Sequence, residues 1–221
     1  MIQAEGLILA GGMSRRMGGV HKGSLTCNGE SFTEILVREL KQEVETVWLS
    51  VGRKAQGGGC RAVQEMKDAA KGRCAVYERE NRVSGCRTVQ DIYAGCGPIG
   101  GLHAGLTVCG SEFLLVAACD MPLLKAKLFS FLYEELRQRG QKRYDGAVSV
   151  TGEGIHPLAA VYRKSAAGIF KEQIEAGNYR LRDALGRLDI LYIDVAGEAY
   201  FARMLQNINT PQDYASVKCG G

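Results

Sequence analysis

The chain has 221 residues, a length that fits one α/β domain with a sizeable buried core. Apolar residues make up 46% and charged residues 24%, which are values of a globular protein and exclude a mainly disordered chain. The net charge of +4 is too small to indicate a nucleic-acid partner. No apolar run reaches the ~18 residues of a membrane-spanning helix, and the amino terminus has no basic, apolar leader. We therefore expect a cytoplasmic protein with reduced thiols and no membrane contact.

The positive charge comes from one polar segment. Residues 52–87 carry nine Lys/Arg and four Asp/Glu, a net charge of +5, so the rest of the chain is close to neutral. A solvated surface excursion over residues 53–86, with a possible strand at 75–77, explains this segment better than a nucleic-acid patch, because basic character alone is a weak signal. No repeat or linker divides the chain, and we predict a single domain over residues 1–221.

Short apolar runs alternate with amphipathic segments along the first half of the chain. A buried strand is predicted at residues 7–10, where the apolar run ends in a glycine-rich loop. Ser31 and Glu34 have the spacing of a capping box, and apolar residues at helical spacing follow, so a helix begins there. Further strands are predicted at residues 46–51 and 87–90.

The second half continues the same alternation. Residues 112–118 give the strongest signal for a buried strand, and a helix follows, with apolar residues spaced from Leu124 to Leu136 and Gly140 as its end. Strands at 147–150, 158–161 and 191–195 and a helix at 166–175 complete the predicted elements. Strands that alternate with helices predict a mostly parallel α/β sheet with helices on both faces.

The loop after the first strand has the composition of a phosphate site. Residues 9–22 contain four glycines and three cations, although they match neither a P-loop nor a G-x-G-x-x-G pattern. Glycines let successive backbone N–H groups approach an anion, while Arg15 and Lys22 supply charge for several phosphates. The alternative is a glycine-rich surface turn with incidental arginines.

Two carboxylates follow predicted strands. Asp120 comes directly after the most apolar strand, and a hard oxygen ligand beside phosphates favours Mg²⁺; the alternative is a helix N-cap before Pro122. Asp91 precedes the small residues at 95–101, which would let a ligand pass close or simply allow tight packing. We interpret His156, which stands before a proline, as structural.

Taken together, these segments resemble the molybdenum cofactor guanylyltransferase family, a branch of the nucleotidyltransferases that begin Leu-Ala-Gly-Gly and have a Rossmann-like sheet. The resemblance is carried by residues 6–22, 91–105, 113–123, 156–163 and 207–211. It implies that GMP is transferred from GTP to phosphorylated molybdopterin, with release of pyrophosphate and a requirement for Mg²⁺. It also implies a set of nucleotide-binding residues, with Asp120 as the metal ligand: Leu9, Ala10, Gly11, Gly12, Lys22, Ser50, Asp91 and Asp120.

The sequence departs from the family pattern at two positions. His21 stands where Asp is common, and Ser50 stands where Asn is usual near the nucleotide. The choice of base is therefore open to a cytidylyltransferase acting on the same pterin, or to a sugar-phosphate nucleotidyltransferase. A non-catalytic nucleotide-binding partner is a further alternative, but the presence of both Asp120 and Lys22 favours catalysis.

The expected chemistry needs charge neutralisation more than a nucleophilic side chain. The attacking phosphate monoester is already mostly ionised at neutral pH, so no general base is required. Arg15, Lys22 and Asp120, the last through the metal, are the expected catalytic residues. We expect Asp91 to accept hydrogen bonds from guanine, whereas the Ser50 hydroxyl suits either base. The expected partners are GTP and molybdopterin, with transient contacts to cofactor-synthesis or acceptor proteins.

Overall fold

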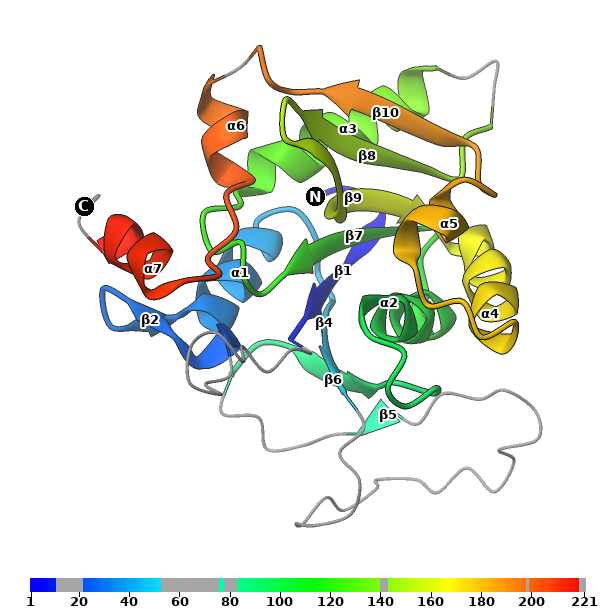
Figure 1. Ribbon diagram of the computed structural model, residues 1–221, viewed down its shortest axis with the longest axis horizontal. Coiled ribbons are helices and arrows are strands. Elements are labelled where there is room, and N and C mark those ends of the chain that lie inside the picture. Colours follow the sequence, from blue (N-terminus) through cyan, green and yellow to red (C-terminus); the bar gives the residue numbers. More distant parts are fainter. Residues whose placement is uncertain (11–21, 53–75, 78–82, 140–142, 198, 219–221) are drawn as a thin grey trace.

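The computed structural model describes residues 1–10, 22–52, 76–77, 83–139, 143–197 and 199–218. An eight-stranded sheet in the order β10-β8-β9-β7-β1-β4-β6-β5 runs through it (Figure 1). Its strands are β1 (Ala4–Leu9), β4 (Val47–Val51), β5 (Val76–Tyr77), β6 (Arg87–Gln90), β7 (Phe113–Ala118), β8 (Gly146–Thr151), β9 (Gly154–Arg163) and β10 (Ile190–Asp194). A separate hairpin joins β2 (Thr26–Cys27) to β3 (Glu30–Ser31).

Most neighbouring strands of the large sheet are parallel. β1 pairs in parallel with both β4 and β7, and β4 pairs in parallel with β6. β9 is antiparallel to β7 and to β8, so β8 and its parallel neighbour β10 run in the direction of β7. Six strands therefore end at one edge of the sheet, and the predicted mostly parallel α/β fold is confirmed.

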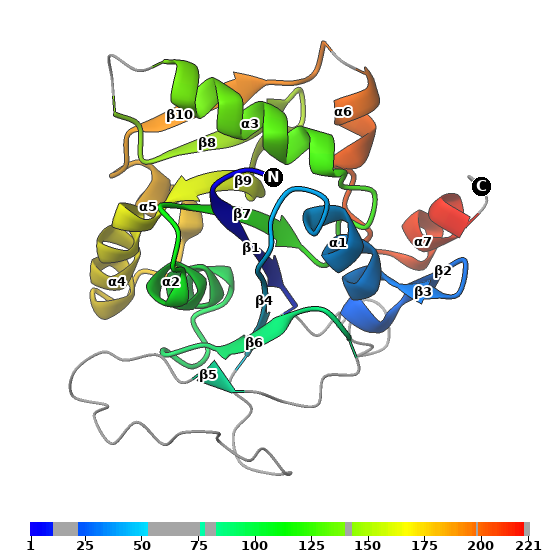
Figure 2. The same cartoon turned by 180° about the vertical axis from the view of Figure 1, so that it is seen from behind.

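Helices cover both faces of the sheet, as predicted. The helices are α1 (Phe32–Leu40), α2 (Pro98–Val108), α3 (Ala126–Gln138), α4 (Ala167–Glu175), α5 (Leu181–Leu185), α6 (Ala199–Met204) and α7 (Pro211–Lys218). Residues of α1, α3 and α6 share one apolar core with the sheet, whereas α2, α4 and α5 build the core on the other face. Figure 2 shows α1 and α3 in front of the sheet. Of the helices that the structure describes, none has the length and apolarity needed to cross a membrane.

The predicted elements agree closely with the observed ones. Ser31 and Glu34 form the capping box of α1, with the Ser31 backbone N–H donating to Glu34 Oε2 at 2.7 Å and the Glu34 N–H donating to Ser31 Oγ at 3.2 Å. Cys109 and Cys119 are both buried. The predicted strand at 75–77 is β5, while most of the 53–86 excursion and Gly140 lie outside the described residues. The single domain stays a prediction.

Some elements were not predicted. The β2–β3 hairpin turns at Asn28 and Gly29, whose positive φ angles of 52° and 84° are typical of the Asn-Gly hairpin signal. Helix α2 begins at Pro98, so part of the small-residue segment at 95–101 lies inside a helix. The short helix α5 and the final helices α6 and α7 were also missed.

The last helix is tied to segments near the start of the chain. The Tyr214 hydroxyl of α7 donates to the Thr26 carbonyl at 2.6 Å, and its ring meets that of Phe32 edge-on at 5.9 Å. Figure 1 shows α7 beside the β2–β3 hairpin. The carboxyl-terminal segment therefore packs against the first hairpin and α1.

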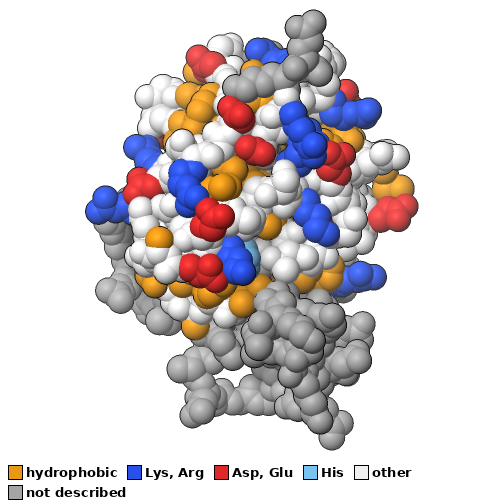
Figure 3. Space-filling model, turned by 90° about the vertical axis from the view of Figure 1, so that its right-hand side faces the viewer, with side chains coloured by type: hydrophobic (Ala, Val, Ile, Leu, Met, Phe, Trp, Pro, Cys, Tyr) orange, Lys and Arg blue, Asp and Glu red, His pale blue; other side chains and the backbone are white. Residues whose placement is uncertain are grey.

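The face formed by α4 and its neighbours mixes both signs of charge. In Figure 3, basic and acidic side chains alternate over the described part of this face. Lys171 and Glu175 lie 3.8 Å apart on α4. Arg187, in the segment after α5, forms an ion pair with Glu172 of α4. These exposed pairs contribute little stability each.

β9 carries a bulge at the edge where the parallel strands end. Val148 lies opposite Ala160, but the next residue, Ser149, lies opposite His156, so residues 157–159 have no partner in β8. Two side-chain hydroxyl groups replace backbone hydrogen bonds that the bulge interrupts. Ser149 donates to the Ala159 carbonyl at 2.8 Å, and Tyr162 donates to the Pro157 carbonyl at 2.8 Å. Buried side chains thus satisfy the backbone that the bulge leaves unpaired.

We predict that Tyr162→Phe lowers the free energy of unfolding by about 1–3 kcal/mol, because the Pro157 carbonyl loses its donor inside the protein. Urea denaturation of the variant beside the unmodified protein measures this difference. Tyr192→Phe, at a half-exposed tyrosine of β10, is the matched control and should be neutral. Equal stability of the two variants would show that the hydroxyl does not hold the bulge.

Candidate active site

Five of the predicted site residues, among them Ala10 directly after β1, lie at the carboxyl edge of the sheet. Leu9 is the last residue of β1, and Ser50 lies in β4. Asp91 directly follows β6, and Asp120 follows β7 with one residue between them. These strands are neighbours in the order β7-β1-β4-β6. Parallel α/β sheets bind ligands in the crevice beyond their carboxyl ends, which is where these residues lie.

Main-chain hydrogen bonds continue past the ends of the strands and fix this edge. The Cys119 N–H donates to the Leu9 carbonyl at 3.1 Å, and the Ala10 N–H donates to the Ser50 carbonyl at 3.2 Å. On the other side, the Asp91 N–H lies 3.5 Å from the Val51 carbonyl. The backbone around these five site residues is therefore held in register with its neighbours.

Ser50 and Asp91 form a side-chain pair across β4 and β6. The Ser50 hydroxyl donates to Asp91 Oδ1 at 2.9 Å. Burial raises the pKa of the Asp91 carboxyl, while the hydrogen bond from Ser50 acts in the opposite direction. Reasoning from the sequence missed this pair, because two residues so far apart meet only once the strand order is known.

Helix α2 packs very closely on these residues. A Cβ atom at Gly101 would lie 2.6 Å from Ser50 Oγ and 2.7 Å from Leu9 Cδ2. A Cβ atom at Gly105, one turn later, would lie 2.5 Å from a methyl group of Leu7. Close packing thus explains why glycine stands at these positions inside the helix. Gly97, at the N-cap position, has a different reason, because its φ of 68° favours glycine.

The helix-cap alternative for Asp120 is excluded. The next helix, α3, begins at Ala126 and its N-cap residue is Lys125. Asp120 instead lies in the loop after β7, where its carbonyl accepts a hydrogen bond from the Ile208 N–H at 2.8 Å. The segment that leads into α7 therefore passes beside this residue.

Lys22 opens a short 3-10 turn (Lys22–Ser24) near the end of β7. A Cβ atom at Gly23 in this turn would lie 3.7 Å from Cys119 Cβ, and the Thr33 hydroxyl donates to the Gly23 carbonyl at 3.0 Å. The turn therefore lies next to the residue before Asp120. Gly11, Gly12 and Arg15 fall outside the described residues.

His156 occupies a structural setting on the second half of the same edge. It is buried in β9, and its Nε2 atom lies 2.8 Å from the Thr151 hydroxyl. Burial lowers the pKa of the imidazole, which favours its neutral form.

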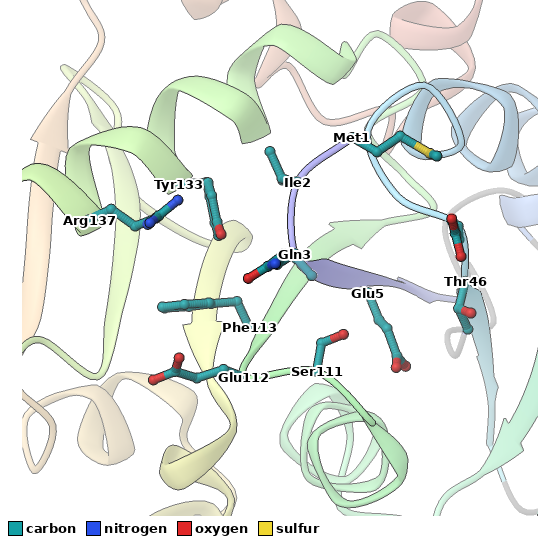
Figure 4. A pocket seen from close by; sticks show the side chains of 12 residues that line it. Met1, Ile2, Gln3, Glu5, Thr46, Ser111, Glu112, Phe113, Tyr133 and Arg137 are labelled. Atoms are coloured by element: carbon teal, nitrogen blue, oxygen red, sulfur yellow. The ribbon is translucent and has the colours of Figure 1, made fainter.

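A hollow of about 650 Å³ lies at the opposite edge, where the strands begin (Figure 4). Gln3, Phe113 and Tyr133 line it. Glu5 at its wall accepts from the Trp48 indole at 2.6 Å and from the Gly110 N–H at 2.9 Å. Because none of the predicted site residues lines this hollow, it is separate from the candidate active site.

Comparison with known proteins agrees with the resemblance found in the sequence. The family model described as the MobA-like NTP transferase domain matches residues 6–191. A probable molybdenum cofactor guanylyltransferase of Pelotomaculum thermopropionicum is 31% identical over 99% of this chain and 93% of its own length. A molybdenum cofactor guanylyltransferase of Yersinia pseudotuberculosis is 29% identical over 94% of this chain and 91% of its own.

Solved structures agree with these relatives. Molybdopterin-guanine dinucleotide biosynthesis protein A from Archaeoglobus fulgidus superposes with a TM-score of 0.73 at 25% identity, over 97% of this chain and 96% of that one. The 2-C-methyl-D-erythritol 4-phosphate cytidylyltransferase from Thermus thermophilus shares the fold, with a TM-score of 0.64 at 13% identity over 99% of this chain and 98% of that one. Since the family model matches most of the chain and the Pelotomaculum relative matches nearly all of it, the chain belongs to the MobA-like NTP transferase family.

Proposed function

We propose that this protein transfers GMP from GTP to phosphorylated molybdopterin and releases pyrophosphate. The observation that carries the proposal is the convergence of Leu9, Ser50, Asp91 and Asp120 at one edge of four neighbouring strands. The names of the relatives that match nearly the whole chain support the same reaction. We place the activity in the cytoplasm, and contacts with cofactor-synthesis or acceptor proteins stay predictions.

In the proposed reaction, a phosphate oxygen of the pterin forms a bond to the α-phosphorus of GTP. The bond between that phosphorus and the bridging oxygen to the β-phosphate breaks, and pyrophosphate leaves with its electron pair. The nucleophile is already ionised, so the protein's task is to align two polyanions and to neutralise their charge. We assign this neutralisation to Lys22 and Arg15, together with the backbone N–H groups at Gly11 and Gly12.

The residues at this edge fit a divalent metal that substrate phosphates help to hold. Within the described ranges, no group of three or more His, Cys, Asp or Glu side chains forms a complete metal site. One carboxylate with substrate phosphates is the donor set that Mg²⁺ commonly takes, and Asp120 is the residue that would hold it. Bound there, Mg²⁺ would supply positive charge beside the phosphates. The family's use of divalent metals supports this assignment.

We predict that Asp120→Ala lowers turnover by more than ~10²-fold, because charge stabilisation at a phosphate contributes several kcal/mol. Pyrophosphate release with GTP and molybdopterin at saturating Mg²⁺ measures the loss, and circular dichroism checks the fold. Asp194→Ala is the matched control, since Asp194 also ends a strand at this edge but lies on the outer strand β10. Turnover of Asp120→Ala equal to that of the control would falsify the metal-ligand role.

We predict that Lys22→Ala weakens GTP binding more than it lowers the melting temperature. A lysine after a glycine-rich loop acts as a point charge for phosphate. A GTP titration beside a melting curve tests this, with Lys171→Ala as the control at an exposed pair on α4. Unchanged GTP affinity combined with a large loss of thermal stability would assign Lys22 to a structural ion pair instead.

We predict that GTP is preferred over CTP by at least about tenfold in kcat/KM, a difference of ~1.4 kcal/mol. An ionised Asp91 can only accept hydrogen bonds, so it suits the N1–H and N2–H₂ donors of guanine and faces the N3 acceptor of cytosine unfavourably. Asp91→Asn adds a donor and should narrow the ratio. Equal use of CTP by the unmodified protein would favour a cytidylyltransferase. If Asp91→Asn leaves the GTP/CTP ratio of kcat/KM unchanged, backbone groups rather than Asp91 select the base.

A further inference from the structure

We propose that Ser50 is a positioning residue that selects the base through Asp91 and makes no contact with the nucleotide itself. This inference rests on the proposed function, in which Asp91 accepts hydrogen bonds from guanine. It changes the role that the resemblance implies for position 50, where the usual Asn would contact the nucleotide.

The first support is the direction of the Ser50 hydroxyl. A serine has one O–H proton, and Ser50 donates it to Asp91 Oδ1 at 2.9 Å. The residue is only 2% exposed, and the backbone of α2 closes over it, since a Cβ atom at Gly101 would lie 2.6 Å from Ser50 Oγ. The hydroxyl is therefore enclosed between Asp91 and the helix, and it has neither a free proton nor open space for a base.

The second support is what this contact does to the Asp91 carboxylate. One oxygen is fixed by Ser50, while Asp91 Oδ2 lies 3.6 Å from the position of a Cβ atom at Gly100. With one oxygen bonded and both flanked by α2, the plane of the carboxylate is restricted. Guanine presents two donors at a fixed spacing, so an acceptor held in one orientation discriminates better than one that rotates.

The third support is the charge of Asp91. Burial raises the pKa of this carboxyl, and the Ser50 hydrogen bond opposes that rise and favours the ionised acceptor. Three other titratable groups face this region from the loop after β6 and from α2. Burial raises the pKa of Cys96 and Tyr93 and lowers that of His103, whose ring lies 5.4 Å from that of Tyr93, so all three favour their neutral forms near pH 7.

The sign of the expected pH effect follows from these contacts. Removing the Ser50 hydroxyl removes a donor that favours the ionised carboxylate, so the pKa of Asp91 rises further. The preference for GTP requires ionised Asp91. As the pH is lowered, this preference is then lost at a higher pH than in the unmodified protein. We expect the acid limb of kcat/KM for GTP to move upward by about one pH unit in Ser50→Ala.

The test compares Ser50→Ala with Ser149→Ala as a matched control. Ser149 is also a buried serine in a strand, but its hydroxyl donates to a backbone carbonyl. Ser50→Ala should raise KM for GTP, change kcat little, narrow the GTP/CTP ratio and shift the acid limb. Ser149→Ala should lose stability with none of these changes. Matching profiles of the two variants would overturn the positioning role, because a merely structural serine would behave in that way.

A double-mutant cycle separates this inference from the proposed function. If Ser50 acts through Asp91, then Ser50→Ala added to Asp91→Asn produces no further change in the GTP/CTP ratio. Additive effects would mean that Ser50 contacts the nucleotide independently, which overturns the inference and leaves Asp91 in its role. If Asp91→Asn alone leaves the ratio and the pH profile unchanged, the base contact of the proposed function fails, and the inference fails with it.

Discussion

Parallel pairing of β7, β1, β4 and β6 is the constraint on which the candidate site depends. Each strand contributes one group at its carboxyl end, and adjacent strands are separated by only about 5 Å. Residues that are dozens of positions apart in the chain thereby become neighbours. The hydrogen bonds that continue to Ala10, Asp91 and Cys119 keep this spacing beyond the last regular residue of each strand.

The close approach of α2 is the second requirement. Glycine inside a helix costs about 1 kcal/mol relative to alanine, and α2 contains glycines at 100, 101 and 105. Because any side chain at Gly101 or Gly105 would collide with Leu7, Leu9 or Ser50, the helix can lie against β1 and β4 only with glycine there. The glycines lower the intrinsic stability of the helix, but they allow its backbone to lie directly over the Ser50–Asp91 pair.

The sequence predicted those features that depend on local patterns. Apolar runs located the strands, the Ser31–Glu34 spacing located the start of α1, and a carboxylate after each strand located Asp91 and Asp120. The Ser50–Asp91 hydrogen bond could not be predicted, because it depends on β4 lying beside β6. The bulge in β9 depends on hydroxyls that reach it from other positions. The β2–β3 hairpin, by contrast, was predictable from Asn28-Gly29 and was overlooked.

The contacts of the carboxyl-terminal segment have a consequence for biosynthesis. The Asp120 carbonyl bonds to the Ile208 N–H, and α7 reaches back to Thr26 through Tyr214. On the ribosome, β1, β4, β6 and β7 are synthesised long before Ile208 and Tyr214, and a domain generally folds as a unit. The loop that carries Asp120 can therefore gain this hydrogen bond only after Ile208 has been synthesised, long after β7. A chain interrupted between β10 and Ile208 would hold every strand of the described sheet, but the Asp120 carbonyl would lack its hydrogen-bond donor.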